Sequence, residues 1–275
     1  MASTRFSTKA ANYILSTGVV LKNGTGGGAP ALQEDAAYPM SNLLKVDRYS
    51  VWATGPTAPN PMLVHIDLGQ DRALTFFAVL GMRQAASLAG NTISSIFGTR
   101  TAAQGYSGVS TDYTDRATVA LPTMGVDGVD GGVVAASSTC RYLQIKVSVI
   151  NTTLGLTLGK FAVGLLDQDL GANLVYSPGA ENHLVTPQVR TETPAGFPVI
   201  SYVGAPYRRF LLPFRAITTA TRDQLNTVAK QTDPFVYFDQ FDVAHECVPA
   251  PENAVAHRWS PPDIWDALLE LRSLG

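Results

Sequence analysis

The sequence has little charge, because only 15% of its 275 residues are Asp, Glu, Lys or Arg. The 20 basic and 22 acidic side chains nearly cancel, which gives a formal net charge of −2. A near-neutral chain lacks the basic surface on which general nucleic-acid binding depends, so no specific nucleic-acid partner is expected. Soluble proteins carry charge on about a quarter of their residues. We interpret the deficit as a sign that parts of the surface are buried against other chains.

Cysteines and long apolar runs are also scarce. The two cysteines, Cys140 and Cys247, are too few for a disulfide scaffold and too far apart for a CxxC redox or zinc motif. No segment approaches the roughly 20 continuous apolar residues of a membrane helix, and the N-terminal segment lacks the apolar core of a secretory signal. We therefore expect neither membrane insertion nor secretion.

Catalytic motifs are absent as well. The Gly-rich segment 23–28 is not followed by the Lys-Ser/Thr of a phosphate-binding loop, and there is no Gly-x-Ser-x-Gly motif. His65 lies inside a predicted strand, where a hydrogen-bonded histidine is the ordinary interpretation. We predict that the chain is not an enzyme. A hydrolase acting on cell-surface polysaccharide is the alternative that remains open.

The first 170 residues contain short segments typical of β-strands, separated by Gly, Ser, Thr and Pro. Alternating or continuous apolar residues predict the strands, which are 62–68, 74–80, 117–121, 142–149 and 156–165. The remainder of 98–138 is polar and Gly-rich and is expected to form long loops. Many short strands of this kind predict a β-sandwich over residues 1–170.

Two aspartates lie in the Gly-rich segment 125–132. Asp127 and Asp130 are weak candidates for Ca²⁺ ligands, because this ion prefers oxygen ligands. The segment lacks the acidic residue that ends an EF-hand loop, so a pair of turns is the favoured interpretation. Apart from this weak Ca²⁺ candidate, we predict no cofactor.

Residues 171–275 are predicted to form a smaller α+β domain. A strand at 207–217 is followed by a helix with a capping box from Thr221, ending near Gln231, and by an aromatic strand at 235–239. The segment 260–263 carries the Ser-Pro-Pro-Asp start signal of a C-terminal amphipathic helix. Its predicted interface side chains are Ile264, Trp265, Leu268 and Leu271.

The segment from Ala37 to Trp52, with the strand that ends Ile-Asp-Leu-Gly at Gly69, resembles the opening of the discoidin-like, galactose-binding-type β-sandwich. Segments 140–147 and 158–164 resemble its closing strands. The resemblance implies structural roles for three residues, with Asn42 shaping a loop, Trp52 filling the core and Asp67 holding a neighbouring loop. Lys45 and Val46 replace the expected acidic and Gly residues, which argues against the calcium site of discoidin modules.

A variant of this module in minor tail proteins of tailed bacteriophages is a closer match. There an Arg-rich strand leads into a short helix and an aromatic strand, which resembles segments 207–214, 221–231 and 234–238. The resemblance covers about residues 35–165 and 200–240. It implies a structural virion subunit at the tail tip or baseplate, assembled in the host cytoplasm as a homo-oligomer with other tail proteins. A head decoration or head–tail connector protein is a further alternative.

The main alternative is a carbohydrate- or receptor-binding module, since discoidin-type sandwiches bind ligands with loops at one end. Tyrosines there would stack on sugar rings, and arginines would donate hydrogen bonds. The candidate ligand-binding residues are Tyr38, Arg48, Tyr49, Arg100, Tyr106 and Tyr113. For each tyrosine the competing interpretation is a half-buried loop anchor. A virion protein can combine both functions by binding a host-surface glycan.

Overall fold

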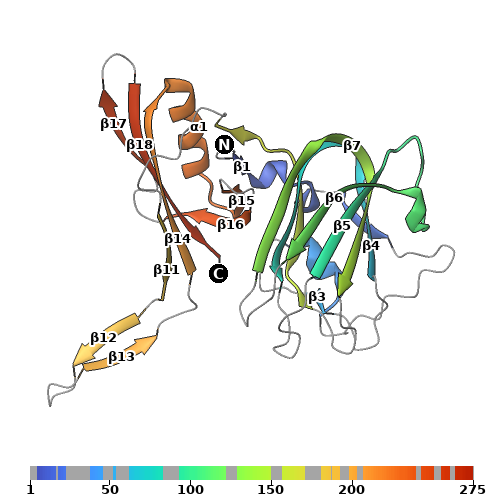
Figure 1. Cartoon of the computed structure of the whole chain (residues 1–275), viewed down its shortest axis with the longest axis horizontal. Coiled ribbons are helices and arrows are strands. Elements are labelled where there is room, and N and C mark those ends of the chain that lie inside the picture. The colour runs from blue at the N-terminus through green and yellow to red at the C-terminus, as the bar shows by residue number, and fades with distance from the viewer. Residues whose placement is uncertain are drawn as a thin grey trace. The chain divides into compact units, whose positions relative to one another are not determined.

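The computed structural model describes most of the chain (Figure 1). The described residues are 5–16, 18–22, 38–45, 52–53, 62–82, 93–121, 129–149, 157–170, 181–186, 188–192, 198–202, 207–239, 243–250, 255–260 and 264–274. Within them β-strands predominate, and α1 (Thr219–Ala229) is the one α-helix. The prediction of a mainly β fold with a short helix is therefore confirmed. None of the helices in these ranges is long and apolar enough to span a membrane.

The chain forms two compact units. The first unit comprises Ala2–Asp169 together with Pro234–Glu246, and the second comprises Leu170–Asp233 together with Cys247–Gly275.

The main sheet of the first unit is antiparallel, in the order β2-β4-β7-β5-β6, with β9 also paired to β4. Its strands are β2 (Val20–Lys22), β4 (Met62–Met82), β5 (Ile93–Arg100), β6 (Thr114–Leu121), β7 (Val129–Val149) and β9 (Lys160–Gly164). The pairing of β4 with β7 shifts between Asp67 and Arg72. The first part of β4 pairs with β2 and its last part with β9. This long strand therefore contributes to both layers of a β-sandwich.

The core of the sandwich lies between these layers. On β7, Leu143, Ile145 and Val147 alternate into it, as the sequence predicts. Trp52, in β3 (Trp52–Ala53), pairs with β8 (Thr157–Leu158) and is completely buried there. Leu43 of the 3₁₀ helix η3 (Met40–Leu44) is also buried in this core.

A second group of strands in the first unit runs in the order β10-β1-β15-β16. These strands are β1 (Arg5–Ser7), β10 (Gln168–Asp169), β15 (Phe235–Phe238) and β16 (Ala244–Pro249), whose first three residues belong to this unit. Two 3₁₀ helices, η1 (Lys9–Ala11) and η2 (Tyr13–Leu15), follow β1. Phe76, Ala78 and Leu80 pack against the residues of β15 and β16. The apolar run 74–80 is continuous because both faces of that strand are buried.

The second unit contains β14 and β18 as an antiparallel pair. Its strands are β11 (Glu181–Val185), β12 (Gln188–Glu192), β13 (Pro198–Tyr202), β14 (Tyr207–Ile217), β17 (Val255–Ser260) and β18 (Ile264–Ser273). β11 pairs with β14, β17 and Cys247–Pro249 pair with β18, and β12 and β13 form a hairpin. Figure 1 shows α1 lying beside β18, and its side chains Leu225 and Val228 are buried.

Three sequence predictions about secondary structure are wrong. Residues 264–273 form β18 where a C-terminal helix was expected. The apolar residues of this segment fit a helical spacing (264, 268, 271) and also strict alternation (265, 267, 269, 271). β14 pairs with one edge of residues 264–273, and β17 and β16 pair with the other edge. These backbone hydrogen bonds favour a strand over a helix.

The second error concerns the start of the helix. Thr218 is the N-cap of α1, and its hydroxyl accepts a hydrogen bond from the N–H of Thr221 at 3.3 Å. Thr221 therefore lies inside the helix. The third error concerns 98–138, where residues 129–138 belong to β7 instead of a loop. Cross-strand partners on β4 hold this polar stretch extended.

Candidate functional site

The candidate ligand residues lie in different parts of the first unit. Tyr38 precedes η3, Arg100 ends β5, and Tyr106 and Tyr113 lie in the segment 101–113 that connects β5 to β6. Arg48 and Tyr49 lie outside the described residues, as do Asp127 and the side chain of Asp130. Three of the described candidates, Arg100, Tyr106 and Tyr113, thus belong to segment 101–113 or to the strand end next to it.

Arg100 organises segment 101–113. Its guanidinium donates hydrogen bonds to the carbonyl oxygens of Gln104, Gly105 and Asp112, at distances between 2.6 and 3.3 Å. On β4, the carboxylate of Asp71 accepts a hydrogen bond from the N–H of Ala102 at 2.8 Å. The donors of Arg100 thus bind its own loop, so the side chain shapes this segment.

Tyr113 anchors the same segment from below. Its hydroxyl donates to the carbonyl oxygen of Ser107 at 2.8 Å, and the side chain is almost completely buried. A Cβ atom on Gly98 would lie 2.9 Å from the Cβ of Tyr113, so glycine lets the segment approach β5 closely. Burial raises the pKa of Tyr113 to about 12. Tyr113 matches the loop-anchor interpretation, because no ring face is left for a ligand.

A buried polar pair lies under the segment. His65 on β4 and Gln144 on β7 are directly opposite each other, and the side-chain nitrogen of Gln144 lies 2.7 Å from Nε2 of His65. Ser110, in η5 (Ser110–Asp112), donates to Oε1 of Gln144 at 3.1 Å. With the amide donating, Nε2 of His65 is the acceptor and the imidazole is neutral. Burial also lowers the pKa of His65.

Tyr106 is the exposed aromatic side chain of the segment. Its residue is 38% exposed, yet its ring makes edge-to-face contacts with His65 and Tyr142, at centroid distances of 5.9 and 5.8 Å. Edge-to-face contacts of this kind favour one ring orientation. Tyr106 is therefore an aromatic surface with restricted motion.

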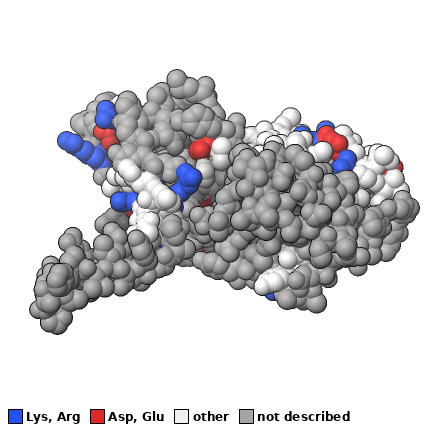
Figure 2. Space-filling view, turned by 60° about the horizontal axis from the view of Figure 1, so that its bottom comes forward, with Lys and Arg blue, Asp and Glu red and all other residues white. Residues whose placement is uncertain are grey.

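Two basic side chains of β7 are paired with acidic residues. Arg141, whose guanidinium lies 5.1 Å from the ring centroid of Tyr142, donates to both carboxylate oxygens of Asp67 at 2.9 and 3.2 Å. Lys146 pairs with Asp115 at 2.9 Å. Figure 2 shows basic and acidic side chains interspersed on the described surface of this unit. Among the described residues of β7, these two basic side chains are therefore neutralised by acidic partners.

The residues with predicted structural roles are placed as follows. Trp52 is completely buried, and Asn42 is more than nine-tenths buried in η3. Asp67 accepts a hydrogen bond from the N–H of Gly69 at 2.9 Å in addition to its bonds with Arg141. Tyr38 is 46% exposed and accepts a backbone hydrogen bond from Ala53 beside Trp52.

The predicted interface residues lie on a strand, so they divide between its two faces. Ile264 and Leu268 are exposed, whereas Leu271 is completely buried on the opposite face. Trp265 is half-buried, and the guanidinium of Arg222 on α1 lies 4.7 Å from its ring centroid. The expected four-residue apolar surface is therefore not continuous.

The described part of the chain contains no group of three or more His, Cys, Asp or Glu side chains arranged to hold a metal ion. No motif in the sequence marks His65, Gln144 or Ser110 as supports of the aromatic surface. The alternating pattern of 62–68 and 142–149 places His65 and Gln144 on the outward faces of their strands. Only the register of β4 on β7 brings them together.

No protein-family model and no curated protein sequence matches the chain. Among solved structures, a chitosan-binding module of a chitosanase/glucanase from Paenibacillus sp. IK-5 is 18% identical with a TM-score of 0.40, over 56% of this chain and 98% of that one. A module of a family 31 glycoside hydrolase from Clostridium perfringens is 12% identical with a TM-score of 0.41, over 55% and 96%.

A family 29 fucosidase from Ruminococcus gnavus, solved with fucose, is 16% identical with a TM-score of 0.42. The match covers 59% of this chain and 28% of the fucosidase. At such low identities and TM-scores, these likenesses assign no ligand to the chain.

Proposed function

We propose that the chain binds a neutral saccharide, with the ring of Tyr106 as the surface on which a sugar stacks. The observation that carries this proposal is the exposed ring of Tyr106 held in place by His65 and Tyr142. A side chain that is already ordered loses little conformational entropy when a ligand binds. Its face offers apolar contact to the C–H groups of a sugar, and its hydroxyl donates and accepts hydrogen bonds.

The charges around Tyr106 favour a neutral ligand. Arg141 is paired with Asp67, Lys146 with Asp115, and Arg100 binds its own segment. A polyanionic ligand is attracted by an excess of unpaired basic side chains, whereas these three basic side chains already have partners. Polar groups on the segment, such as Ser107 and Asp112, hydrogen-bond each other at 2.5 Å and supply acceptors for sugar hydroxyls.

The test is a glycan array that contains neutral and acidic saccharides, followed by calorimetry with the best binder. We expect neutral saccharides to bind and Tyr106→Ala to weaken binding at least tenfold. Tyr106→Phe keeps the ring and should retain binding within a few-fold. Tyr38→Ala removes another exposed tyrosine of the described residues and is the matched control, with unchanged affinity. A folded protein that binds no saccharide on the array contradicts the proposal.

A second candidate function is a structural subunit of a bacteriophage virion, at the tail tip or baseplate. The order of elements supports it, because β14, α1 and β15 follow one another as the resemblance to phage minor tail proteins implies. In this proposal the chain binds copies of itself and other tail proteins, is assembled in the host cytoplasm, and catalyses no reaction. Mass spectrometry of purified particles and light scattering of the isolated protein test it. A strictly monomeric protein that is missing from particles contradicts it.

A further inference from the structure

His65 is a buried histidine against which segment 101–113 packs. The residue is 1% exposed, and its ring contacts Tyr106 and Tyr113 at centroid distances of 5.9 and 5.5 Å. Both contacts come from the same segment, most of whose residues are half-buried or exposed. A segment of this kind can open locally while the strands beneath it stay paired. Opening would remove two of the rings that shield the imidazole from water.

The hydrogen bonds of His65 suit a neutral imidazole. The side-chain nitrogen of Gln144 lies 2.7 Å from Nε2, and Ser110 donates to the oxygen of the same amide at 3.1 Å. Nδ1 then carries the proton, and it is buried without a hydrogen-bond partner among the described residues. A charged imidazole donates from both nitrogens. The Gln144 amide would have to turn over, and a charged N–H at Nδ1 would be left without an acceptor.

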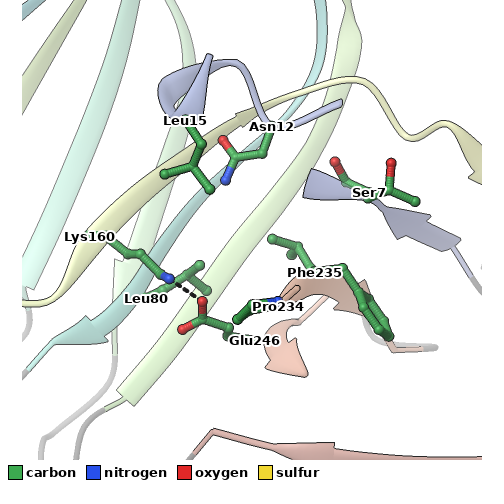
Figure 3. A pocket seen from close by; sticks show the side chains of 10 residues that line it. Ser7, Asn12, Leu15, Leu80, Lys160, Pro234, Phe235 and Glu246 are labelled. Carbon is green, nitrogen blue, oxygen red and sulfur yellow. Dashed lines mark ion pairs between the residues drawn. The ribbon is translucent and has the colours of Figure 1, made fainter. Parts of the chain in front are cut away.

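Other buried charges of the first unit have partners of opposite sign. Lys160 and Glu246 are both 2% exposed and form a salt bridge, with their charged groups pointing toward each other in Figure 3. Asp67 is 6% exposed and pairs with Arg141. His65 forms no ion pair with any residue that the structure describes. A charged His65 would therefore be a buried charge without a counter-ion, and burial lowers its pKa.

The charged residues on the elements around His65 are mostly bound to other groups. β2 places Lys22 directly opposite His65, and the side chain of Lys22 lies outside the described residues. Asp71 on β4 accepts the N–H of Ala102. The ion pairs on β4, β6, β7 and segment 101–113 are Arg141 with Asp67, Lys146 with Asp115, and Arg100 with Asp112. Side chains of Asp, Lys and Arg ordinarily keep their charge between pH 5.5 and 7.5, whereas histidine titrates in this range.

We propose that segment 101–113 is an acid-sensitive cover, which opens locally when His65 takes up a proton. In the closed segment, the two rings and the Gln144 amide hold the imidazole neutral. In the open segment, water solvates both nitrogens of the charged ring. Proton uptake and opening therefore favour each other. For the saccharide site, acid would remove the fixed orientation of Tyr106, a consequence that rests on the proposed function.

The direction of the pH dependence follows from the two states of the segment. With the segment open, His65 titrates near the ordinary histidine value of 6.5, and with it closed the pKa is lower. Between these values the open state binds more protons, so acid favours opening. From pH 7.5 to pH 5.5 the ratio of open to closed segment should rise by up to about tenfold.

Amide hydrogen exchange of the intact chain tests the proposal. The amides of Gly105 and Asp112 donate to carbonyl oxygens within the segment. After correction for the chemical exchange rate, their protection should fall about three- to tenfold from pH 7.5 to pH 5.5. Low urea concentrations should not accelerate them, because a local opening exposes little surface, but should accelerate the amide of Ile145 on β7. Equal acceleration by urea would show that the whole unit unfolds and would overturn the proposal.

Two substitutions test whether His65 is the proton acceptor. His65→Gln removes the titrating group and should abolish the pH dependence of segment exchange. Gln144→Glu places a carboxylate against Nε2, which stabilises the charged ring in the closed segment, and should abolish or reverse the dependence. His245→Gln is the matched control, because His245 is the other histidine of the first unit and pairs with Asp239. It should keep the wild-type dependence.

The outcomes separate this proposal from the proposed function. Segment protection that does not change with pH in the wild type overturns the acid-sensitive cover. A wild-type pH dependence that persists in His65→Gln or in Gln144→Glu also overturns it. These measurements need no saccharide, so a protein that binds none contradicts the proposed function alone.

Discussion

The side-chain nitrogen of Gln144 lies 2.7 Å from Nε2 of His65, directly beneath the segment that carries Tyr106. Ser110 of the same segment donates to the other end of the Gln144 amide. A neutral histidine is therefore built into the support of the proposed ligand surface. The protonation state of His65 can be changed by pH, and the residue can be replaced by one that does not titrate.

The stability of the first unit should fall as the pH is lowered through about 6.5. Burial lowers the pKa of His65 in the folded protein, whereas the unfolded chain takes up the proton near its ordinary value of 6.5. Between these two pKa values the unfolded state binds more protons, so acidification lowers the free energy of unfolding. Urea denaturation at pH 7.5 and at pH 5.5 measures the change.

Two variants identify the residue responsible. His65→Gln should show a smaller loss between these pH values, because the titrating group is gone. His183→Gln, which changes an exposed histidine on β11, should keep the wild-type dependence. An identical pH dependence in His65→Gln and the wild type would show that other groups control it.

Arg100→Ala should release segment 101–113. The guanidinium holds three carbonyl oxygens of this segment through its planar set of donors, which alanine lacks. Hydrogen exchange of these amides should accelerate about tenfold or more, which corresponds to a local loss of roughly 1.4 kcal/mol. Saccharide binding should weaken in parallel, because Tyr106 loses its fixed orientation.

Arg116→Ala is the control for this loop experiment. Arg116 is exposed on β6 and donates to the hydroxyl of Thr99, outside segment 101–113. Its removal should leave the exchange of the segment unchanged. Equal exchange in Arg100→Ala and wild type would mean that the strands alone order the loop.

Trp52→Ala should destabilise the first unit by about 3–5 kcal/mol, as expected for a large buried aromatic side chain. Trp52 is completely buried against the apolar residues of the sandwich core. Tyr38→Ala changes a neighbouring exposed residue and should alter stability by less than about 0.5 kcal/mol. Urea denaturation compares the two, and equal values would contradict the burial of Trp52.

Removal of calcium should leave the melting temperature unchanged. The Asp127–Asp130 segment lacks a terminal acidic ligand, and the described residues form no cluster of metal-ligand side chains. Differential scanning fluorimetry in EDTA and in calcium chloride measures this directly. A rise of several degrees with calcium would show that an ion binds.

The sequence predicted those strands whose apolar residues follow a regular pattern within one short segment. The alternation of 142–149 predicted a half-buried strand, and the continuous run 74–80 predicted a buried strand. The burial of Trp52 followed from a motif resemblance. Each of these signals lies within a short stretch of chain, so it can be recognised without knowledge of the partners.

Features that depend on pairing between distant segments were not predictable. The contact of His65 with Gln144 requires the register of β4 on β7, and the salt bridge of Lys160 with Glu246 requires residues 234–246 to pack with the first unit. The tyrosines of 101–113 were recognised by residue type. Which of them is exposed depends on the hydrogen bonds of Arg100 and Tyr113, for which the sequence has no signal.

The C-terminal segment provides the sharpest test of a strand against a helix. In β18, Leu268 is exposed and Leu269 is completely buried, because neighbouring residues point to opposite faces. A helix with the spacing 264, 268 and 271 would instead bury Leu268. Leu269→Ala should therefore cost about 2–5 kcal/mol of stability in the second unit, and Leu268→Ala less than about 0.5 kcal/mol. Urea denaturation, with hydrogen exchange to assign the effect to β14 and β18, measures both variants. A larger loss for Leu268→Ala than for Leu269→Ala would contradict the strand.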